Sequence, residues 1–420
     1  MLTARLQSIF SGQFIRNIGW LGAAELLNRF LRLGTTVTLA RVLTPYDYGL
    51  AAVILTTQEI ANVFTLRSGL GAKLIQAPAE DLEVLCNTAY WMNWILCIGM
   101  FILQCAIAWP VAWFYGNSAV VLPICVIGLQ YLLLPTFAVQ GTLIFRENRM
   151  NVPAICNALQ SLVMNSLTIV LALRGFGFWA IVLPILLTVP IWVIVNRANH
   201  AWRPTGKFSL VRWQELANFA ANFLGVELLT KVRANIDYLL VGRFLGIEAL
   251  GMYYFAFNAG LGISLSVIQS LTWSIYPHLC EVRSNFQAMQ SRYFKSLKTI
   301  ACVIIPLVLI QSSLAPLYVP IVFSSKWLSA IPILILVCLS AIPRPFAEAA
   351  SMLLQTVDRG RIDLYWNAIF TGIFVLALCI GMTWGIYGVA ASVLVVHVIA
   401  LPLFSFWVNR MVFKRSASTV

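Results

Sequence analysis

The stretch ELLNRFLRLGT, residues 25–35, places one glutamate and two arginines inside an apolar run that is long enough to span a membrane. Residues 227–237, ELLTKVRANID, begin with the same three letters at an offset of 202 residues and again mix acidic and basic side chains. The same offset matches Arg29 to Lys231. Because charged positions are rare in apolar sequence, the match indicates an internal repeat. The two stretches therefore predict a membrane protein built from two related halves.

The composition supports a membrane location. The chain has 420 residues, of which 60% are hydrophobic and 10% are charged, whereas an ordinary soluble domain has roughly 25% charged residues. The first residues, MLTARLQSIFSGQFIRN, lack the short apolar core and cleavage site of a secretory signal, so we expect the first spanning helix to target the chain. The nine cysteines lie almost entirely in apolar runs without metal-ligand or disulfide spacing, which predicts core packing and no metal site.

The apolar runs predict the number of membrane spans. A helix needs about 20 mainly apolar residues to cross the bilayer core. Runs of this length, separated by short charged or Gly/Pro-containing turns, predict an all-α polytopic protein with about twelve transmembrane helices. The predicted helices lie at residues 17–43, 46–66, 84–112, 119–145, 150–173, 176–196, 214–244, 249–279, 296–322, 328–356, 362–384 and 386–409. An even number of spans places both termini on one side.

Lysine and arginine are distributed unevenly over the two sides. Of the 28 basic residues, 19 fall on the side that holds the termini and five lie within spans. The remaining four are Arg41, Arg174, Arg243 and Lys326. The positive-inside rule then places both termini in the cytoplasm. The net charge of +13 follows from this topology and from a basic rim that contacts anionic membrane lipids, so we expect no nucleic-acid partner.

The longest basic polar link between apolar runs is RANHAWRPTGKFSLVR, residues 197–212. It separates six predicted helices from six more, which predicts pseudo-symmetric lobes at residues 1–200 and 201–420. Because six is even, both halves enter the membrane from the same side, as in the parallel repeats of many transporters. The offset of 202 residues also matches Arg41 to Arg243, Leu43 to Leu245, and Gly49 to Gly251.

Several predicted helices carry polar stripes. Positions i, i+4, i+7 and i+11 share one helix face, and in the first helix these positions are Glu25, Arg29, Arg32 and Thr36. Comparable stripes are formed by Glu227, Lys231 and Tyr238, flanked by Thr230, Arg233 and Asp237; by Arg344, Glu348, Ser351 and Gln355; and by Gln58, Glu59 and Asn62. Arg344 stands between Pro343 and Pro345, which predicts a broken or kinked helix there.

Two interpretations of the stripes stay open. A charge at mid-membrane costs roughly 2.5–3.5 kcal/mol on insertion scales, so these side chains must face protein or water. In the first interpretation they line a hydrated cavity with cationic walls, and Arg32 and Arg233 exceed one-to-one pairing with acids. The second is a set of i,i+4 ion pairs, namely Glu25 with Arg29, Glu227 with Lys231 and Arg344 with Glu348. Repetition of the stripes in both halves favours the cavity.

A single histidine, His397, lies near the middle of the last predicted helix, in VLVVHVIAL. A neutral imidazole at this depth can carry protons or can hydrogen-bond to a neighbour without further function. The second role is the commoner one.

Residues 39–76, LARVLTPYDYGLAAVILTTQEIANVFTLRSGLGAKLIQ, resemble the signature region of Wzx-type polysaccharide flippases. These proteins belong to the multidrug/oligosaccharidyl-lipid/polysaccharide exporter (MOP) superfamily, which includes the MATE exporters. The matching elements are Arg41, Leu43-Thr44-Pro45, Asp47, Tyr48-Gly49, Gly69, Gly71 and Ile75-Gln76. A weaker echo lies at residues 242–246, GRFLG, followed by Ala249-Leu250-Gly251. Family members often have fourteen helices, two more than the runs predict here.

The resemblance implies a V-shaped, MATE-like pair of six-helix lobes in the bacterial inner membrane. It implies a flippase that moves polyprenyl-pyrophosphate-linked oligosaccharide repeat units to the periplasmic leaflet by alternating access. The product would be exopolysaccharide, capsule or O-antigen lipopolysaccharide. Implied partners are the lipid-linked oligosaccharide, membrane lipids, and the polysaccharide polymerase and chain-length machinery.

The resemblance implies roles for the striped residues and for His397. A pyrophosphate needs cationic partners, and arginine offers bidentate contacts to phosphate oxygens. The expected substrate-binding residues are Arg29, Arg32, Lys231, Arg233 and Arg344. The expected residues for ion or proton coupling are Glu25, Glu59, Glu227, Asp237, Glu348 and His397. We expect no catalytic residue, cofactor or metal.

Two other classes of protein fit the sequence less well. A cation-coupled multidrug or small-molecule exporter of the same superfamily would favour an acidic cavity, whereas five basic residues lie within the predicted spans. A membrane glycan polymerase or ligase usually needs a sizeable outer loop that carries catalytic residues. The sequence has no such loop and no HExxH, GxSxG or P-loop motif. We therefore expect a transporter and not an enzyme.

Overall fold

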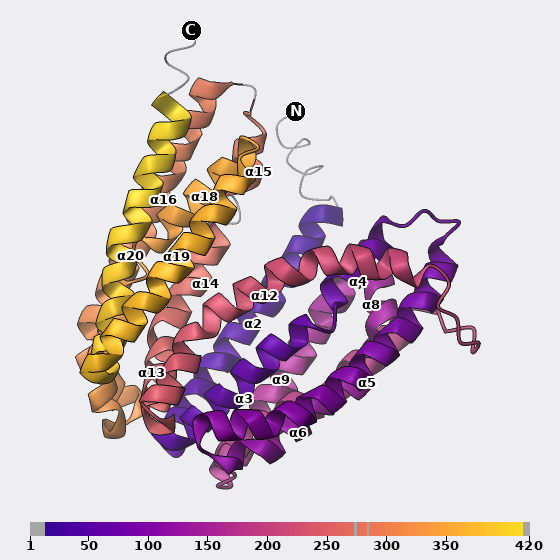
Figure 1. The fold of residues 1–420 in the computed structure, drawn as a ribbon, viewed down its shortest axis with the longest axis horizontal. Helices are drawn as coiled ribbons and strands as arrows, with labels where there is room; N and C mark the ends of the chain where they lie inside the picture. Colours follow the sequence, from indigo (N-terminus) through magenta and orange to yellow (C-terminus); the bar gives the residue numbers. More distant parts are fainter. Residues whose placement is uncertain (1–12, 273–274, 284, 415–420) are drawn as a thin grey trace. The chain divides into compact units, whose positions relative to one another are not determined.

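The computed structural model describes residues 13–272, 275–283 and 285–414 (Figure 1). These residues form helices joined by short turns, with no β-strand among them, which confirms the predicted all-α class. The chain divides into two compact units. The first ends at Asn235 and the second begins at Ile236.

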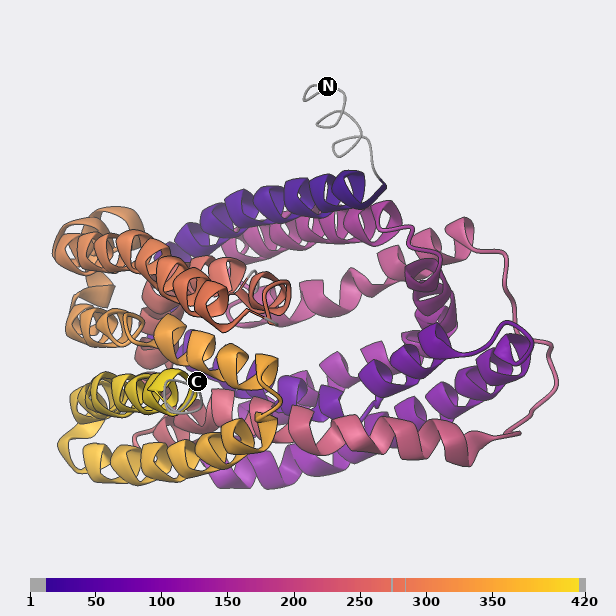
Figure 2. The same cartoon turned by 90° about the horizontal axis from the view of Figure 1, so that it is seen from above.

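The first unit is built from four long helices, α2, α5, α9 and α12, and from the shorter ones that pack on them, within the described residues. Its helices are α2 (Gln13–Val42), α3 (Pro45–Val63), α4 (Arg67–Gln76), α5 (Leu82–Tyr115), η1 (Ser118–Val120), α6 (Val121–Gly128), α7 (Gln130–Leu133), α8 (Pro135–Arg146), α9 (Asn151–Leu173), α10 (Trp179–Leu187), α11 (Val189–Asn199), and α12 (Trp213–Phe244) as far as Asn235. Helices α2 and α9 lie side by side in both views (Figure 1, Figure 2). Helix α5 packs along α6 and α8.

In its described residues, the second unit contains the end of α12 and eight further α-helices, with short 3-10 and π-helical segments between them. Its other helices are α13 (Ile247–Ala256), η2 (Phe257–Leu261), α14 (Gly262–Thr272), α15 (Ile275–Cys280), α16 (Phe286–Tyr318), η3 (Val319–Phe323), η4 (Ser325–Ala330), α17 (Ile331–Leu339), α18 (Arg344–Thr356), α19 (Gly360–Gly381), η5 (Met382–Trp384), α20 (Gly385–Asn409) and η6 (Arg410–Lys414). Helices α19 and α20 form an antiparallel pair, and α20 also packs on α17 and α18.

Each of the twelve predicted ranges overlaps one helix or a run of short helices. Within the described residues, seven stretches are long and apolar enough to cross a membrane, and an eighth is added if the bent pair at 118–146 counts as one span. The stretches that contain α2 and α12 are not among them, because their charged residues lower the hydropathy. The structure thus has the expected helical ranges, while the count of twelve spans stays a prediction.

Prolines and a π-helical turn break several of the predicted runs. The run predicted at 119–145 bends by 56° where α8 begins at Pro135. The break predicted around Arg344 is present, since residues 340–343 form a turn between α17 and α18. The run predicted at 249–279 is interrupted at residues 257–261 by a π-helical segment. Such interruptions free backbone groups and often lie near functional sites.

The helix boundaries preserve the repeat that the sequence predicts. Helix α2 ends at Val42 and α12 ends at Phe244, while α3 begins at Pro45 and α13 begins at Ile247. Both junctions therefore keep the offset of 202 residues. The connection after α12 turns at Gly246, whose φ of +91° lies in the left-handed region that glycine tolerates.

The signature motif after α2 has a clear structural role. Thr44 caps α3, Pro45 occupies its first turn, and the Asp47 carboxylate accepts hydrogen bonds from the backbone N–H and hydroxyl of Thr44, which completes a capping box. The second carboxylate oxygen of Asp47 accepts a hydrogen bond from the backbone N–H of Phe178 at 3.2 Å. A Cβ at Gly177, where φ is +55°, would lie 2.8 Å from that oxygen. Asp47 thus ties α3 to the loop before α10.

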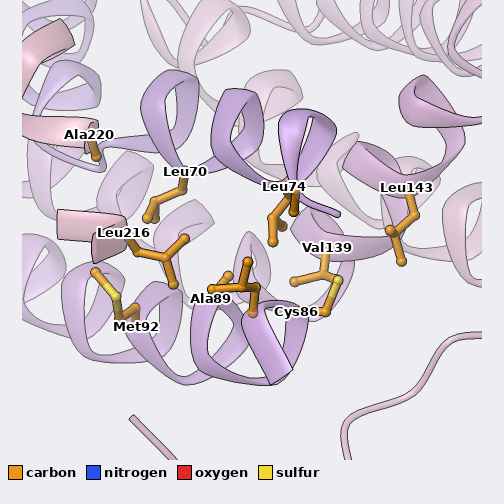
Figure 3. Close-up of a cluster of buried hydrophobic side chains, with 11 residues drawn as sticks. Leu70, Leu74, Cys86, Ala89, Met92, Val139, Leu143, Leu216 and Ala220 are labelled. Atoms are coloured by element: carbon orange, nitrogen blue, oxygen red, sulfur yellow. The ribbon is translucent and has the colours of Figure 1, made fainter. Parts of the chain in front are cut away.

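The beginning of α12 is part of the first unit because it packs into that unit's core. Leu216 and Ala220 of α12 join a buried apolar cluster from α4, α5 and α8 that includes Leu70 (Figure 3). At this crossing a Cβ on Gly69 would lie 2.4 Å from the Cα of Ala220, so only glycine allows so close an approach. Figure 3 shows the cluster, in which the labelled side chains are Leu70, Leu74, Cys86, Ala89, Met92, Val139, Leu143, Leu216 and Ala220.

The link at 197–212 is also bonded to the first unit. The hydroxyl of Thr88 donates to the carbonyl of Val211 at 2.6 Å, and the indole of Trp91 donates to the carbonyl of Lys207 at 2.9 Å. Arg212 forms ion pairs with Asp81 and Glu215, and its hydrogen bonds to these two carboxylates raise the pKa of its guanidinium. The boundary between the compact units along the chain therefore falls within α12. The six-helix lobes at residues 1–200 and 201–420 stay a prediction.

Candidate functional site

Helices α3 and α12 meet in the first unit through a chain of polar side chains. The Lys231 ammonium lies 3.3 Å from a carboxylate oxygen of Glu59. The Asn235 amide donates to the same oxygen at 3.4 Å and to the carbonyl of Lys231 at 3.0 Å. The hydroxyl of Thr56 donates to the Asn235 side-chain oxygen at 3.4 Å. Asn235 is buried, whereas Lys231 and Glu59 remain 41% and 51% exposed, so both charges can reach a ligand.

The partner of Lys231 differs from the one that helix spacing suggests. Within the described residues, Glu227 does not form the i,i+4 ion pair with Lys231; it accepts a hydrogen bond from the hydroxyl of Ser68 at 3.4 Å. Lys231 is paired across helices with Glu59 instead. The interpretation of the stripe as a staple within α12 is therefore wrong for this pair, because the packing of α3 brings a second carboxylate nearer.

A buried amide network fixes the orientation of α3. Gln58 donates to Asn62 at 3.1 Å and to the phenol oxygen of Tyr131 at 3.0 Å. Gln104 donates to Gln58 at 2.9 Å and to the carbonyl of Ile124 at 2.7 Å. Gln58, Gln104 and Tyr131 are all buried, while the neighbouring Glu59 is exposed. The network therefore holds Gln58 inward and turns the Glu59 carboxylate outward.

The described part of α2 separates its charged residues from its packing face. The hydroxyl of Thr35 donates to Asn165 of α9 at 2.7 Å, and Asn28 accepts a hydrogen bond from Ser161 of α9 at 2.7 Å. Arg29 is half-buried and Arg32 is exposed. No carboxylate lies within ion-pair distance of Arg32 in the described residues. The side chain of Glu25 lies outside the described residues, so its predicted pairing with Arg29 is not described either.

The second unit contains a more deeply buried cluster around Asp237. Its carboxylate accepts a hydrogen bond from the phenol of Tyr253 at 2.9 Å and one from the backbone N–H of Tyr238 at 3.0 Å. Asp237 is 6% exposed and Tyr253 is fully buried. Arg344 interacts electrostatically with Tyr253 and Asp237 and also with Glu348. The Nε of Arg344 is buried without a hydrogen-bond partner in the described part of the chain, so this guanidinium retains donor capacity.

Glu348 lies one turn after Arg344 on α18. The hydroxyl of Thr272, which is fully buried at the end of α14, donates to a carboxylate oxygen of Glu348 at 2.9 Å. The break after α17 allows α18 to begin at Arg344 and to present Arg344 and Glu348 together. The cluster of Asp237, Arg344 and Glu348 therefore combines two carboxylates with one guanidinium.

The last two predicted residues have simpler surroundings. His397 is 6% exposed, its Nδ1 lies 2.7 Å from the carbonyl of Val393, and its ring lies edge-on to Phe370 and Phe374 at 5.5 Å each. This geometry is that of a buried histidine bonded to its own helix. Arg233 is half-buried on α12.

Sequence analysis missed several residues that complete these clusters. Asn235 continues the stripe of Glu227 and Lys231 by one more turn, so its spacing could have revealed it. Thr56, Ser68, Tyr253 and Thr272 come from other helices and act only through tertiary packing. No signal in a single sequence identifies such partners.

The fold is that of solved structures of a flippase and of multidrug transporters. The chain is similar to a lipid II flippase, MurJ, in an inward closed conformation, with a TM-score of 0.77, 13% identity and coverage of 93% of this chain and 87% of the flippase. It is also similar to an inward-facing MATE multidrug transporter of the MOP superfamily, with a TM-score of 0.75, 13% identity and coverage of 94% and 96%. These likenesses confirm the predicted MOP-type fold.

Residues 38–332 match the model of the polysaccharide biosynthesis protein family, and the chain belongs to this family. It is 24% identical over 396 residues to the lipopolysaccharide biosynthesis protein WzxC of Escherichia coli (strain K12), covering 90% of this chain and 77% of that protein. It is 23% identical over 366 residues to the teichuronic acid biosynthesis protein TuaB of Bacillus subtilis (strain 168), covering 84% and 73%. The predicted family resemblance is thus confirmed, and family and fold together class the chain as a multi-pass membrane transporter and not an enzyme.

Proposed function

We propose that this protein is a flippase that moves polyprenyl-pyrophosphate-linked oligosaccharide repeat units across the bacterial inner membrane for surface polysaccharide synthesis. The observation that carries the proposal is the family match over residues 38–332, in a chain whose fold is that of MOP transporters. Relatives include the succinoglycan biosynthesis transport protein ExoT of Rhizobium meliloti (strain 1021), 22% identical over 355 residues, with 84% of this chain and 71% of ExoT covered. Transport would proceed by alternating access, as substrate binding shifts the population between two conformations.

The basic side chains would bind the anionic head of the substrate. The proposed residues are Arg29, Arg32, Lys231, Arg233 and Arg344. Lys231 is 41% exposed beside Glu59, and Arg32 is exposed without a carboxylate partner in the described residues. Exposed cations on a stretch that inserts into a membrane are costly unless they meet water or an anion. A pyrophosphate supplies that anion, and guanidinium groups can hold its oxygens in pairs.

The acidic residues would couple transport to an ion or proton. The proposed residues are Glu25, Glu59, Glu227, Asp237, Glu348 and His397. Asp237 has the best structural support, because it is a nearly buried carboxylate with two hydrogen-bond donors and an arginine close by. Such a group changes its interactions strongly when it gains or loses a proton. His397 has the least support, because its Nδ1 is bonded within its own helix.

The orientation and partners belong to the same proposal. We infer that both termini lie in the cytoplasm, because 19 of 28 basic residues fall on that side of the predicted topology. The partners would be membrane lipids, the lipid-linked oligosaccharide, and the polymerase and chain-length machinery that take up the flipped unit.

A cation-coupled multidrug or small-molecule exporter is the alternative function. The TM-scores of 0.77 and 0.75 for the flippase and the multidrug transporter are nearly equal, so the fold alone does not separate them. The family match and the basic side chains in the helices support an anionic cargo.

Deleting the gene in its host tests the proposal. The expected result is loss of surface polysaccharide, with lipid-linked repeat units accumulating in the inner leaflet, and restoration by the intact gene. Normal polysaccharide together with altered resistance to cationic drugs would support the exporter instead.

A further inference from the structure

A pocket of about 430 Å³ lies within the first unit, where α5 and α8 meet the link after α11. This volume falls in the range of small-molecule sites, roughly 300–1,000 Å³. Its polar lining consists of Glu83, Arg146, Glu147, His200 and Trp202, and Cys86 also borders it. None of these residues belongs to the clusters around Lys231 or Asp237.

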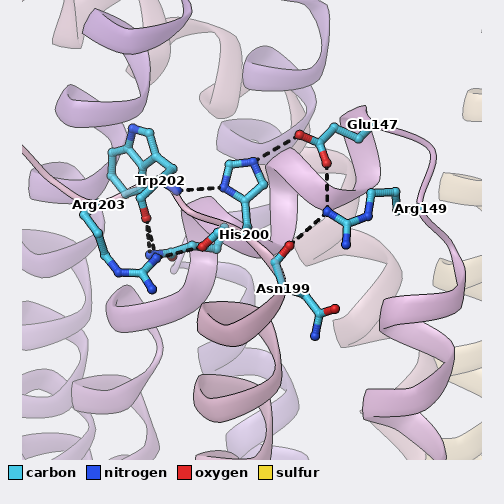
Figure 4. A network of polar contacts seen from close by, with 7 residues as sticks. Glu147, Arg149, Asn199, His200, Trp202 and Arg203 are labelled. Carbon is cyan, nitrogen blue, oxygen red and sulfur yellow. Dashed lines mark hydrogen bonds and ion pairs between the residues drawn. The ribbon is translucent and has the colours of Figure 1, made fainter.

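A hydrogen-bond network borders the pocket at Glu147, His200 and Trp202 (Figure 4). Glu147 pairs with Arg149 at 3.2 Å and with Nε2 of His200 at 3.2 Å. The backbone N–H of Trp202 donates to Nδ1 of His200 at 3.0 Å, so the ring proton resides on Nε2 and points to Glu147. Arg203 donates to the carbonyls of His200 and Trp202 at 2.7 Å each. The Glu147 charge is therefore already neutralised, and this border of the pocket is held in place.

Two charged side chains of the pocket have no opposite charge within ion-pair distance among the described residues. Arg146 donates from one nitrogen to the carbonyls of Leu74 and Ile75 at 2.7 and 3.0 Å, and these are neutral acceptors. Glu83 is exposed, and no base lies within ion-pair distance of it in the described residues. Both side chains act electrostatically on the buried Cys86, so they approach the same region. An acid and a base thus share one pocket without contacting each other.

We propose that this pocket binds the head group of an ethanolamine phospholipid, with the phosphate on Arg146 and the ammonium on Glu83. Arg146 uses one terminal nitrogen for the two carbonyls, which leaves its other donors for phosphate oxygens. The ammonium supplies the donors that an exposed carboxylate accepts. A purely anionic head group would leave Glu83 unpaired and repelled. A zwitterion matches both charges at once.

The surroundings favour a lipid over a soluble zwitterion. Ile75, Val84 and Phe145 are large apolar side chains with exposed fractions of 45%, 44% and 45%. The carbonyl of Ile75 accepts a hydrogen bond from Arg146, and Val84 and Phe145 are the sequence neighbours of Glu83 and Arg146, which line the pocket. Helix α5, which carries Glu83, continues into one of the apolar stretches that can cross a membrane. Acyl chains of a lipid whose head occupies the pocket would cover this exposed apolar surface.

Native mass spectrometry of the purified full-length chain, titrated with phosphatidylethanolamine or phosphatidylglycerol, tests the proposal. The wild type should bind phosphatidylethanolamine more tightly. Glu83→Gln should weaken that binding by about tenfold, as expected for loss of one charge-assisted hydrogen bond, and Glu83→Lys should reverse the preference. Glu80→Gln, an exposed acid in the turn just before α5 that does not line the pocket, is the matched control and should change nothing.

The test uses Glu83 variants because the Glu83 side chain has no hydrogen-bond or ion-pair partner among the described residues. Arg146→Gln would be less specific, because it would also break the hydrogen bonds from Arg146 to the carbonyls of Leu74 and Ile75. Equal affinity of the wild type for both lipids would overturn the proposal. An equal response of Glu83→Gln and Glu80→Gln would do the same. Binding of water-soluble phosphoethanolamine with Glu83 dependence, without binding of the phospholipid, would show that the lipid assignment is wrong.

Discussion

Exchanging the charges of Glu59 and Lys231 separates a structural role of this ion pair from a role in substrate binding. The two groups lie 3.3 Å apart and are 51% and 41% exposed. An exposed pair of this kind contributes about 0.2–1 kcal/mol to stability, a change of at most about fivefold in an equilibrium. A charge-assisted hydrogen bond to a phosphate contributes about 1.5–3 kcal/mol, or roughly 10- to 150-fold in binding.

The variants are Lys231→Gln, Glu59→Gln and the double exchange Glu59→Lys with Lys231→Glu. Lys231→Gln should lower the transport rate at limiting substrate by roughly 10-fold or more while the unfolding temperature in detergent changes little. The double exchange retains a pair of opposite charges but moves the cation to α3, and transport should stay low. Complementation of a deletion strain, with quantified surface polysaccharide and matched protein levels, measures the effect.

Recovery of transport to near wild-type levels by the double exchange would refute this reasoning. Lys231 would then serve to join α3 to α12, and the cation on the α12 stripe would have no role in substrate binding. Asn235, which bonds to both partners, would have to be included in that structural account.

Three further predictions concern single substitutions. Gly69→Ala should destabilise the protein by about 1–3 kcal/mol in thermal unfolding, because the added Cβ would meet the backbone of Ala220. Gly99→Ala, which meets nothing within 4 Å on α5, should be neutral or stabilising, and equal effects of the two would contradict the close crossing. Asp237→Asn should abolish most transport, whereas removing one hydrogen bond by Tyr253→Phe should reduce it less; activity of Asp237→Asn near the wild type would exclude a coupling role. Asp47→Ala should lower stability by about 0.5–2 kcal/mol through loss of the capping box, and an unchanged unfolding temperature would refute that role.

The sequence was informative wherever a feature repeats along one helix. Apolar run length predicted ranges such as 150–173 and 386–409, which the structure shows as α9 at Asn151–Leu173 and α20 at Gly385–Asn409. The charged positions predicted the repeat, whose register the ends of α2 and α12 preserve. These successes depend on period and length, which are properties of local sequence.

Partners across helices could not be predicted. The polar stripes include both Glu59 and Lys231, but the pairing of the two depends on how α3 packs against α12. Tyr253 and Thr272 contribute donors to Asp237 and Glu348 from helices that carry no polar stripe of their own. The assignment of early α12 to the first unit follows from Leu216 and Ala220, apolar residues that look the same on a lipid-facing or a core-facing surface.

Flipping by the purified protein tests the central proposal most directly. Proteoliposomes containing a fluorescent polyprenyl-pyrophosphate oligosaccharide would be assayed for the fraction that becomes accessible to a membrane-impermeant quencher. Our account predicts that substrate from the inner leaflet becomes accessible to the quencher faster in liposomes with the wild-type protein than in empty liposomes. Lys231→Gln should slow this process. No acceleration by folded wild-type protein, together with efflux of a cationic dye from the same liposomes, would contradict the flippase function and identify a drug exporter.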